Sequence, residues 1–286
     1  MSEGTQRRFG QTGRDGALTY GDYLQVPELL SLQRLLSDPP VHDELLFIVV
    51  HQAYELWFKQ LLFELESVRE RLFAGDTERA RHYLTRVHAI ERVLIEHIEV
   101  LETMTPQDFL AFRDHLAPAS GFQSAQYRTL EFLLGNKNQA MIAVFAHDPE
   151  TAARLERDLH APSLYDEFLA YLARRDYPIP RRLLERDFAE PHTRDEALVR
   201  IFTGVYADPE HQWDVYETCE ELVDIEDTFQ TWRFRHLKTV ERIIGYKRGT
   251  GGSSSTAPAA SSASAPRSPT RPPRSGAPRP SAPRGP

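Results

Sequence analysis

Residues 44–58 read Glu44-Leu-Leu-Phe-Ile-Val-Val-His51-Gln-Ala-Tyr-Glu-Leu-Trp-Phe58, a stretch without glycine or proline that holds one imidazole among apolar side chains. At roughly 100° per residue, residues 45–50 would cover every side of a helix, and a helix that is apolar all round is normally buried. We therefore expect His51 to lie inside the protein. Phe47 stands four residues earlier, on the same helix face. The simplest interpretation is a core histidine whose ring nitrogens are satisfied by neighbouring groups.

The helix that contains this stretch is expected to be long and to have an antiparallel partner. It begins near His42 and runs to Gly75, a residue type that commonly follows a helix end. Asp76-Thr77 offers a new N-cap. Apolar residues then recur at the three- and four-residue intervals of a partner helix, at Tyr83, Val87, Ile90, Leu94, Ile98 and Leu101. The two helices should form an αα-hairpin.

Start and stop signals predict further helices on both sides of the hairpin. A short helix is expected from Pro27 through Leu35, ended by Pro39-Pro40. Thr105-Pro106-Gln107-Asp108 is a compact start signal for a helix to Leu116. Residues 124–134 are helix-like and end at glycine, and helical segments divided by prolines continue to about residue 206. No strand alternation of useful length occurs, so the sequence predicts an all-α helical bundle with long antiparallel helices.

A second singular imidazole lies in the last long helix, which is expected from Pro209 to Gly245. His236 is the only polar member of a seam of three- and four-residue steps that otherwise holds Phe229, Trp232, Val240 and Ile243. The last 36 residues hold five arginines and no acid, so residues 1–250 carry a charge of −13 against −8 for the whole chain. An acidic body argues against a nucleic-acid partner.

Composition divides the chain into three parts. Residues 1–17 are expected to form a flexible segment, 18–253 a helical domain, and 254–286, rich in Ala, Ser, Pro and Arg, a disordered tail. The single Cys219 excludes an intrachain disulfide and favours a reducing compartment. No apolar run approaches the ~20 residues that span a membrane. We expect a cytoplasmic protein without a membrane partner.

The metal-binding motifs of helical bundles are missing from the sequence. A di-iron site would need Glu-x-x-His on two helices, and this motif does not occur in the sequence. His88-Ala-Ile-Glu91 has merely the reversed order, and we interpret it as a solvated helix face. Haem needs only one axial histidine. His51 and His236 could divide an axial and a distal role, but spacing does not say which is the ligand, and two histidines buried for packing would look the same.

Phe109-Leu-Ala-Phe-Arg113 places an aromatic ring and a guanidinium on one helix face. Arginine binds carboxylates through two parallel hydrogen bonds, so a pocket with this pair and a histidine would suit an aromatic amino acid. The simpler alternative is a surface ion pair of Arg113 with Asp108 or Glu102.

Several ordered motifs resemble the haem-dependent tryptophan 2,3-dioxygenases. The resemblance extends from about residue 18 to 253 and rests on these stretches: Leu18-Thr-Tyr-Gly-Asp-Tyr23-Leu, residues 43–60 around His51, Phe112-Arg113-Asp114, Pro118-Ala-Ser-Gly-Phe-Gln-Ser124, Trp232-Arg-Phe-Arg-His236 and Gly249-Thr-Gly-Gly-Ser253. It implies an all-helical homotetramer with one b-type haem per subunit. It also implies conversion of L-tryptophan and dioxygen to N-formyl-L-kynurenine, the first step of the kynurenine pathway.

The resemblance also implies roles for individual residues. His236 matches the iron ligand, and His51 then lies on the distal side, where its counterpart hydrogen-bonds the indole N–H and Phe47 packs against the ring. Arg113 matches the clamp for the substrate carboxylate, and Thr250 the threonine that contacts the ammonium and carboxylate end. The other matching residues are Tyr20 and Tyr23, which an adjacent subunit contributes to the pocket, and Ser120, Gly121 and Tyr127, which border the haem.

Phe109 occupies a position held by Tyr or Phe in that family. A phenolic contact to the carboxylate is therefore absent, which leaves more of the substrate binding to Arg113 and Thr250. Tyr20 and Tyr23 have a simpler alternative, packing on a neighbouring core. Three rival functions remain: a haem or tryptophan sensor without chemistry, an enzyme for another indole substrate, and a helical scaffold with buried histidines.

Overall fold

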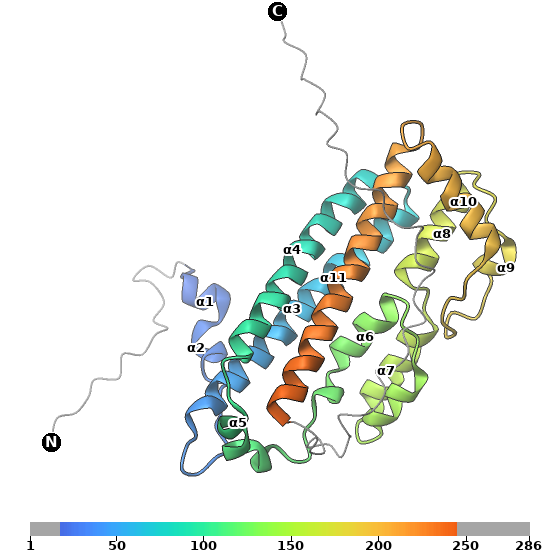
Figure 1. Ribbon diagram of the computed structural model, residues 1–286. Coiled ribbons are helices and arrows are strands. Elements are labelled where there is room, and N and C mark those ends of the chain that lie inside the picture. Colours follow the sequence, from blue (N-terminus) through green and yellow to red (C-terminus); the bar gives the residue numbers. More distant parts are fainter. Residues whose placement is uncertain (1–17, 245–286) are drawn as a thin grey trace, which may run out of the picture.

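The computed structural model describes residues 18–244, all helix and loop with no strand in that range (Figure 1). The α-helices are α1 (Tyr20–Leu24), α2 (Val26–Leu29), α3 (His42–Phe73), α4 (Thr77–Leu101), α5 (Pro106–Phe112), α6 (Ala125–Leu133), α7 (Pro149–His160), α8 (Leu164–Arg174), α9 (Arg181–Leu184), α10 (Glu196–Ala207) and α11 (Trp213–Ile244), and the 3-10 helices are η1 (Arg113–Leu116), η2 (Gly121–Gln123) and η3 (Gln139–Phe145). The predicted all-α class is confirmed.

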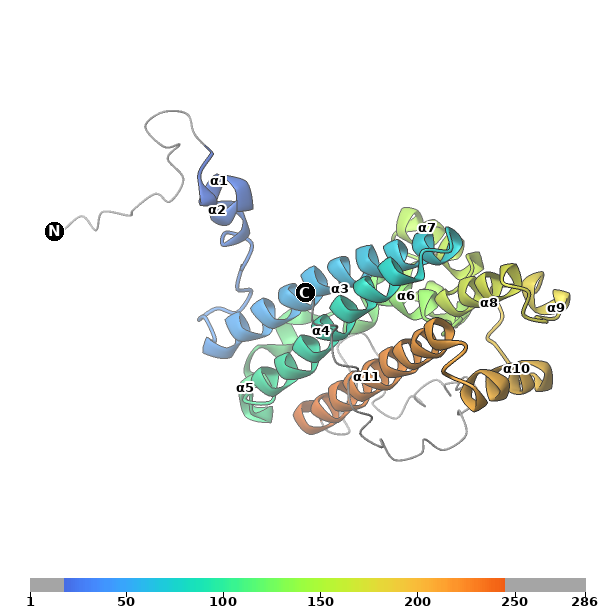
Figure 2. The ribbon, with the colours of Figure 1, turned by 90° about the horizontal axis from the view of Figure 1, so that it is seen from above.

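Three long helices, α3, α4 and α11, form the body of the molecule and run side by side in both views (Figures 1 and 2). The predicted hairpin is confirmed: the Asp76 side chain caps α4 by accepting from the backbone N–H of Arg79, and Gly75 adopts the left-handed φ of +76° that ends α3. The last helix begins at Trp213, not at Pro209 as predicted, because residues 209–212 form a turn that precedes it.

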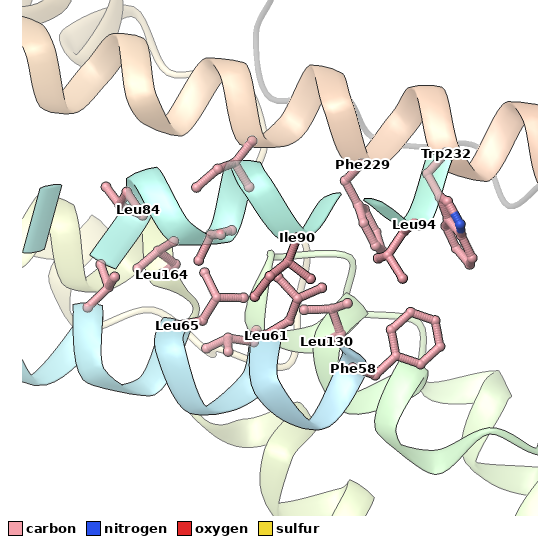
Figure 3. Close-up of a cluster of buried hydrophobic side chains, with 14 of the residues drawn as sticks. Phe58, Leu61, Leu65, Leu84, Ile90, Leu94, Leu130, Leu164, Phe229 and Trp232 are labelled. Atoms are coloured by element: carbon pink, nitrogen blue, oxygen red, sulfur yellow. The ribbon is translucent and has the colours of Figure 1, made fainter. Parts of the chain in front are cut away.

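One apolar core lies between these helices (Figure 3). Leu61 and Leu65 of α3 meet Leu84 and Leu94 of α4, and all four are at most 1% exposed. Removing such a side chain from water stabilises the fold by about 1.5–3 kcal/mol. Trp232 of α11 reaches the same core beside Phe58 (Figure 3).

Shorter helices close the ends of the long ones. The Thr105 hydroxyl and the Asp108 carboxylate form the predicted capping box of α5, but the α-helix stops at Phe112 and tightens into the 3-10 helix η1 rather than continuing to Leu116. Gln126 of α6 donates to the backbone and side-chain oxygens of Glu55 in α3, at 2.9 and 2.8 Å. This bond fixes α6 against the part of α3 that carries His51.

The N-terminal helices stand away from the bundle (Figure 2). The helix predicted from Pro27 to Leu35 is wrong in length, because α2 ends at Leu29 and the following residues are extended along α3, where the Gln52 side chain donates to Leu32 O and accepts from Gln33. A four-residue helix has no core of its own to pack against. Leu30 remains 71% exposed.

The expectation that the apolar run 45–50 is buried on every side is wrong for two of its residues. Leu45 and Val49 are each 46% exposed, and Leu56 and Phe63 are 54% and 66% exposed. These four residues, which we call the outward stripe, lie four and seven positions apart and therefore on one side of the helix. Within residues 18–244, this apolar side is left uncovered.

The interpretation of His88-Ala-Ile-Glu91 as a solvated face is wrong. The Glu91 residue is 2% exposed and His88 Nε2 lies 2.9 Å from a carboxylate oxygen of Glu221, so the pair lies in the contact between α4 and α11. Burial raises the pKa of Glu91 to about 9, which leaves the carboxyl group protonated at neutral pH.

Several predictions fall outside the described residues. The flexible segment 1–17, the tail 254–286, the helix end at Gly245 and the glycine loop with Thr250 all lie beyond residues 18–244. Within those residues, no helix is long and apolar enough to cross a membrane.

Candidate functional site

His51 lies half-buried in α3, and one of its ring nitrogens is fixed by its own helix. Its Nδ1 atom is 2.7 Å from the carbonyl oxygen of Phe47, one turn earlier. A carbonyl oxygen can only accept, so Nδ1 carries the proton of the neutral ring and Nε2 presents a lone pair. Burial lowers the pKa of His51, more strongly than the bond to Phe47 and the charge of Glu55 raise it. Neutral His51 can therefore accept a hydrogen bond at Nε2.

His236 occupies α11 and stacks on Trp232 one turn earlier, with ring centroids 5.3 Å apart and an angle of 13° between the planes. Its side chain forms no hydrogen bond with residues 18–244. Burial, with a smaller contribution from the nearby His51, lowers the pKa of His236 to about 4. A neutral imidazole with both nitrogens unengaged in this range is a competent metal ligand.

Tyr54 and Trp232 connect the two histidines. The Tyr54 ring meets His51 edge to face at 6.2 Å and meets Trp232 edge to face at 5.8 Å. The predicted convergence of His51 and His236 is therefore present, with aromatic rings from α3 and α11 between their helices.

An aromatic cluster lies beside His51. The Phe47 ring stacks obliquely against the imidazole at 4.0 Å and contacts Phe109 and Phe112 of α5 at 5.7 and 5.6 Å. Phe109 and Phe112 are buried, and their rings meet edge to face. The capping box of α5 positions both rings against α3, so Phe47, His51 and Phe109 come together as predicted.

Arg113 directly follows this cluster at the junction of α5 and η1. Its backbone N–H donates to Phe109 O, and its side chain is half-buried. The two carboxylates suggested for a surface ion pair have other partners: Asp108 accepts from Thr105, and Glu102 accepts from Thr239 and pairs with Arg235. Arg113 therefore lies at the edge of the aromatic cluster formed by Phe47, Phe109 and Phe112.

The remaining cofactor candidates lie on the segment between η1 and α6. Tyr127 packs against Phe58, Phe229 and Trp232 at 5.8, 6.0 and 5.5 Å, so it joins the aromatic group that leads to His236. Ser120 caps η2 through a capping box with Gln123. A methyl group added to the exposed Gly121 would meet no atom within 4 Å. Open space borders the segment at Gly121.

Tyr20 and Tyr23 lie apart from the rest of the site. They are 78% and 73% exposed on α1, and the alternative that they pack on a core of the same chain is wrong. Thr250 lies beyond the described residues. Two open hollows of about 400 and 480 Å³, at the α3–α4 turn and beside α10, contain none of the predicted site residues.

The sequence analysis missed Tyr54 and Phe112 as members of the site. Tyr54 follows His51 by three residues and Phe112 follows Phe109 by three, so both lie on the helix faces already singled out. A search of every i+3 and i+4 neighbour of the chosen residues would have found them.

The donor set fits haem better than a bare metal ion. No group of three or more His, Cys, Asp or Glu side chains within residues 18–244 forms a metal site. Haem supplies four iron ligands itself and needs one imidazole, a role open to neutral His236. The rings of Phe47, Tyr54, Phe58, Tyr127 and Trp232 provide apolar surroundings for a flat macrocycle.

These features define an all-α protein with an aromatic-lined site, in which one imidazole is suited to an iron and another to a polar N–H of the ligand. A comparison with protein families gives the particular family. The model of the tryptophan 2,3-dioxygenase family matches residues 3–204 and 197–264, and the chain belongs to that family.

Named relatives agree with the family assignment. The chain is 55% identical over 237 residues to a tryptophan 2,3-dioxygenase of Kineococcus radiotolerans, covering 83% of each chain. It is 52% identical over 237 residues to the one of Serratia proteamaculans, covering 83% of this chain and 85% of the relative. It is 51% identical over 243 residues to the tryptophan 2,3-dioxygenase of Xanthomonas euvesicatoria, and the match covers 85% of this chain and 82% of the relative. The predicted family is confirmed.

Proposed function

We propose that this chain uses haem b to convert L-tryptophan and dioxygen to N-formyl-L-kynurenine. Family membership carries the general statement that the chain is an oxidoreductase, a tryptophan dioxygenase of the first step of tryptophan catabolism. The observation that carries the site is the convergence of two neutral imidazoles beside an aromatic cluster with Arg113 at its edge.

His236 is proposed as the iron ligand. Haem, when bound, supplies the iron centre at which dioxygen reacts. Support comes from the lowered pKa of His236, which keeps the nitrogen lone pair available, and from the stack on Trp232, which limits the orientation of the ring. The Nδ1 bond of His51 to a carbonyl is also common among metal-bound histidines, so the roles need an experimental test.

His51 is proposed to orient the substrate. Its Nε2 lone pair can accept the indole N–H, because Nδ1 donates to Phe47 O. The Phe47 ring, 4.0 Å from the imidazole, offers a face on which an indole can pack. Orientation of the indole beside the iron accelerates reaction without proton transfer. His51 therefore acts as a positioning acceptor.

Arg113 and Thr250 are proposed to bind the amino acid end of tryptophan. The guanidinium presents two parallel N–H groups to a carboxylate, and its place beside Phe109 sets the distance from the aromatic cluster. Phe109 supplies no hydroxyl, which gives Arg113 a larger share of carboxylate binding. Ser120, Gly121 and Tyr127 are proposed to border the haem, with Tyr127 supported by its contact with Trp232.

The proposed enzyme is a homotetramer in which α1 of a neighbouring subunit reaches the pocket. The exposed Tyr20 and Tyr23 and the exposed outward stripe of α3 support this assembly, since large apolar surfaces mark protein interfaces. The single Cys219 and the acidic body support a cytoplasmic location.

One experiment tests the proposed function. The purified protein is reduced, mixed with L-tryptophan and air, and followed by absorbance for both the haem spectrum and N-formylkynurenine. The proposal expects a Soret band and product formation. A tryptophan-dependent spectral shift without product would favour a sensor. A protein that purifies without a Soret band would favour a helical scaffold. Either result contradicts the proposal.

A further inference from the structure

Three buried polar atoms from three different helices lack hydrogen-bond partners among the described residues. They are the hydroxyl of Tyr54 in α3, Nδ1 of His97 in α4 and Nε1 of Trp232 in α11. Buried polar atoms are nearly always paired, because an unpaired one loses its bonds to water without replacement. The Trp232 indole N–H lies close enough to the Tyr54 hydroxyl to oppose the rise in the pKa of Tyr54 that burial causes, but the two groups are not aligned for a hydrogen bond of good geometry. The arrangement therefore leaves a place for a bridging partner.

The three side chains gather around Tyr54. The centroid of its ring is 5.8 Å from the centroid of His97 and 5.8 Å from that of Trp232. The Trp232 indole, with its nitrogen, hangs from α11 into the core (Figure 3).

The hydrogen-bonding capacities of these groups are complementary. The indole N–H of Trp232 only donates, the Tyr54 hydroxyl donates and accepts, and the role of the His97 ring nitrogen depends on the position of its proton. One water molecule has two donors and two lone pairs, and buried waters typically form about three hydrogen bonds. A single water would satisfy all three side chains.

Tyr54 also contacts both sides of the proposed active site. Its ring meets His51 edge to face at 6.2 Å. It meets Trp232, and Trp232 stacks on His236 at 5.3 Å. The orientation of the Tyr54 and Trp232 rings therefore limits the orientation of both imidazoles.

We propose that Tyr54, His97 and Trp232 hold one ordered water, and that this water-bridged lock fixes the ring planes of His51 and His236. The consequence for the iron rests on the proposed function. Tyr54 is a positioning residue, since it acts through the two histidines. Groups behind a metal-bound histidine tune the ring orientation and hence the reduction potential of the iron.

The substitution Tyr54→Phe tests the lock, because it keeps the ring and removes only the hydroxyl. In the full-length protein as purified, a hydroxyl buried without a partner would be a cost, and its removal would raise the thermal midpoint. A hydroxyl that is hydrogen-bonded to the ordered water stabilises the folded protein, so the proposal expects Tyr54→Phe to lower the thermal midpoint.

Tyr171→Phe is the matched control. Tyr171 is also a buried tyrosine, but it accepts from Arg175 at 2.5 Å near the α3–α4 turn, outside the proposed active site. Both variants should have a lower midpoint. Only Tyr54→Phe should change the electron paramagnetic resonance spectrum of the ferric protein and its reduction potential, and it should weaken haem binding by about 3- to 10-fold.

A second variant measures the coupling. If Tyr54 and His97 share one water, the effects of Tyr54→Phe and His97→Leu on the thermal midpoint should be clearly non-additive in the double variant. The proposal would be overturned if Tyr54→Phe had a raised or unchanged thermal midpoint and a ferric spectrum identical to that of the parent protein. A parent protein without a Soret band would overturn the proposed function instead, and the sign of the midpoint change would still decide whether the lock exists.

Discussion

His51 and His236 differ in the groups that surround their ring nitrogens. His51 has its proton fixed on Nδ1 by the carbonyl of Phe47, whereas His236 is held by stacking on Trp232 alone among residues 18–244. Burial lowers both pKa values, so neither ring needs to lose a proton before it binds a ligand or accepts a bond at neutral pH. The difference supports the separate roles proposed for two residues of the same type.

We predict that His236→Ala abolishes stable haem binding and that His51→Ala retains it. The first substitution removes the proposed iron ligand, while the second removes an acceptor for the substrate and should lower turnover and affinity without abolishing activity. Haem content and the Soret band of the two purified variants check this. A normal haem spectrum in His236→Ala would show that the assignment is wrong.

Arg113→Ala should weaken the binding of tryptophan by ~2–5 kcal/mol, because the carboxylate loses a charged partner in an enclosed site. Arg113→Lys should recover only part of this loss, since an ammonium group lacks the planar pair of N–H donors. Equilibrium titration of tryptophan, followed by the haem spectrum, measures both variants. Unchanged affinity in Arg113→Ala would exclude the carboxylate role.

At the scale of single elements, short helices are positioned by side-chain bonds rather than by length. α8 begins at a buried capping box in which Asp166 accepts from Ser163. The same carboxylate accepts from Arg186 and His192, which ties the loop after α9 to the start of α8. Lys137 caps the C-terminus of α7 by donating to three backbone carbonyls.

Asp166 should make stability depend on pH in the acid range. Burial alone would raise the pKa of Asp166, but bonds from His192, Arg186 and Ser163 outweigh it and hold the pKa well below the usual 3.8. A carboxylate with a lowered pKa stabilises the fold above its unfolded pKa, and this contribution is lost as the pH falls. The loss should begin below about pH 4.

We predict that Asp166→Asn lowers the free energy of unfolding by ~3–5 kcal/mol at pH 7, because the guanidinium of Arg186 loses a buried carboxylate partner. The difference from the parent protein should shrink below about pH 4. Urea unfolding at a series of pH values measures it. Asp148→Asn, which changes the half-buried cap of α7 to another good capping residue, is the control and should have a smaller effect.

At the scale of the whole molecule, apolar surface on α3 and α1 is exposed among residues 18–244. The outward stripe lies on the side of α3 that faces away from the other bundle helices, and the two tyrosines lie on α1. The same helix that carries His51 and Phe47 inward carries Leu56 and Phe63 outward. The proposed subunit contact and the proposed active site therefore both lie on α3, so a change at one can affect the other.

We predict that Leu56→Glu combined with Phe63→Glu reduces the mass of the assembly, because two charges would be buried in the contact. Light scattering after size-exclusion chromatography measures the mass, and circular dichroism checks that the helices remain. Val223→Glu, on the exposed side of α11, is the control and should keep the mass of the parent protein. An unchanged mass in the double variant would contradict a role for the stripe in assembly.

The sequence alone determined the helical class, the αα-hairpin, the caps at Asp76 and Thr105, and the pairing of Phe47 with His51. Each depends on residues within one or two helical turns, where periodicity and capping chemistry act directly. Residues 245–286, and Thr250 with them, lie outside what the structure describes.

Only the tertiary structure decided which apolar sides are covered and which polar groups are enclosed. It buried Glu91, exposed the outward stripe, and ended α2 early, because burial depends on which helices meet and not on the pattern of one helix. It also brought Tyr54, His97 and Trp232 together from three helices. Sequence periodicity identifies a helix face, but the contact that turns this face into a site forms between residues far apart in the chain.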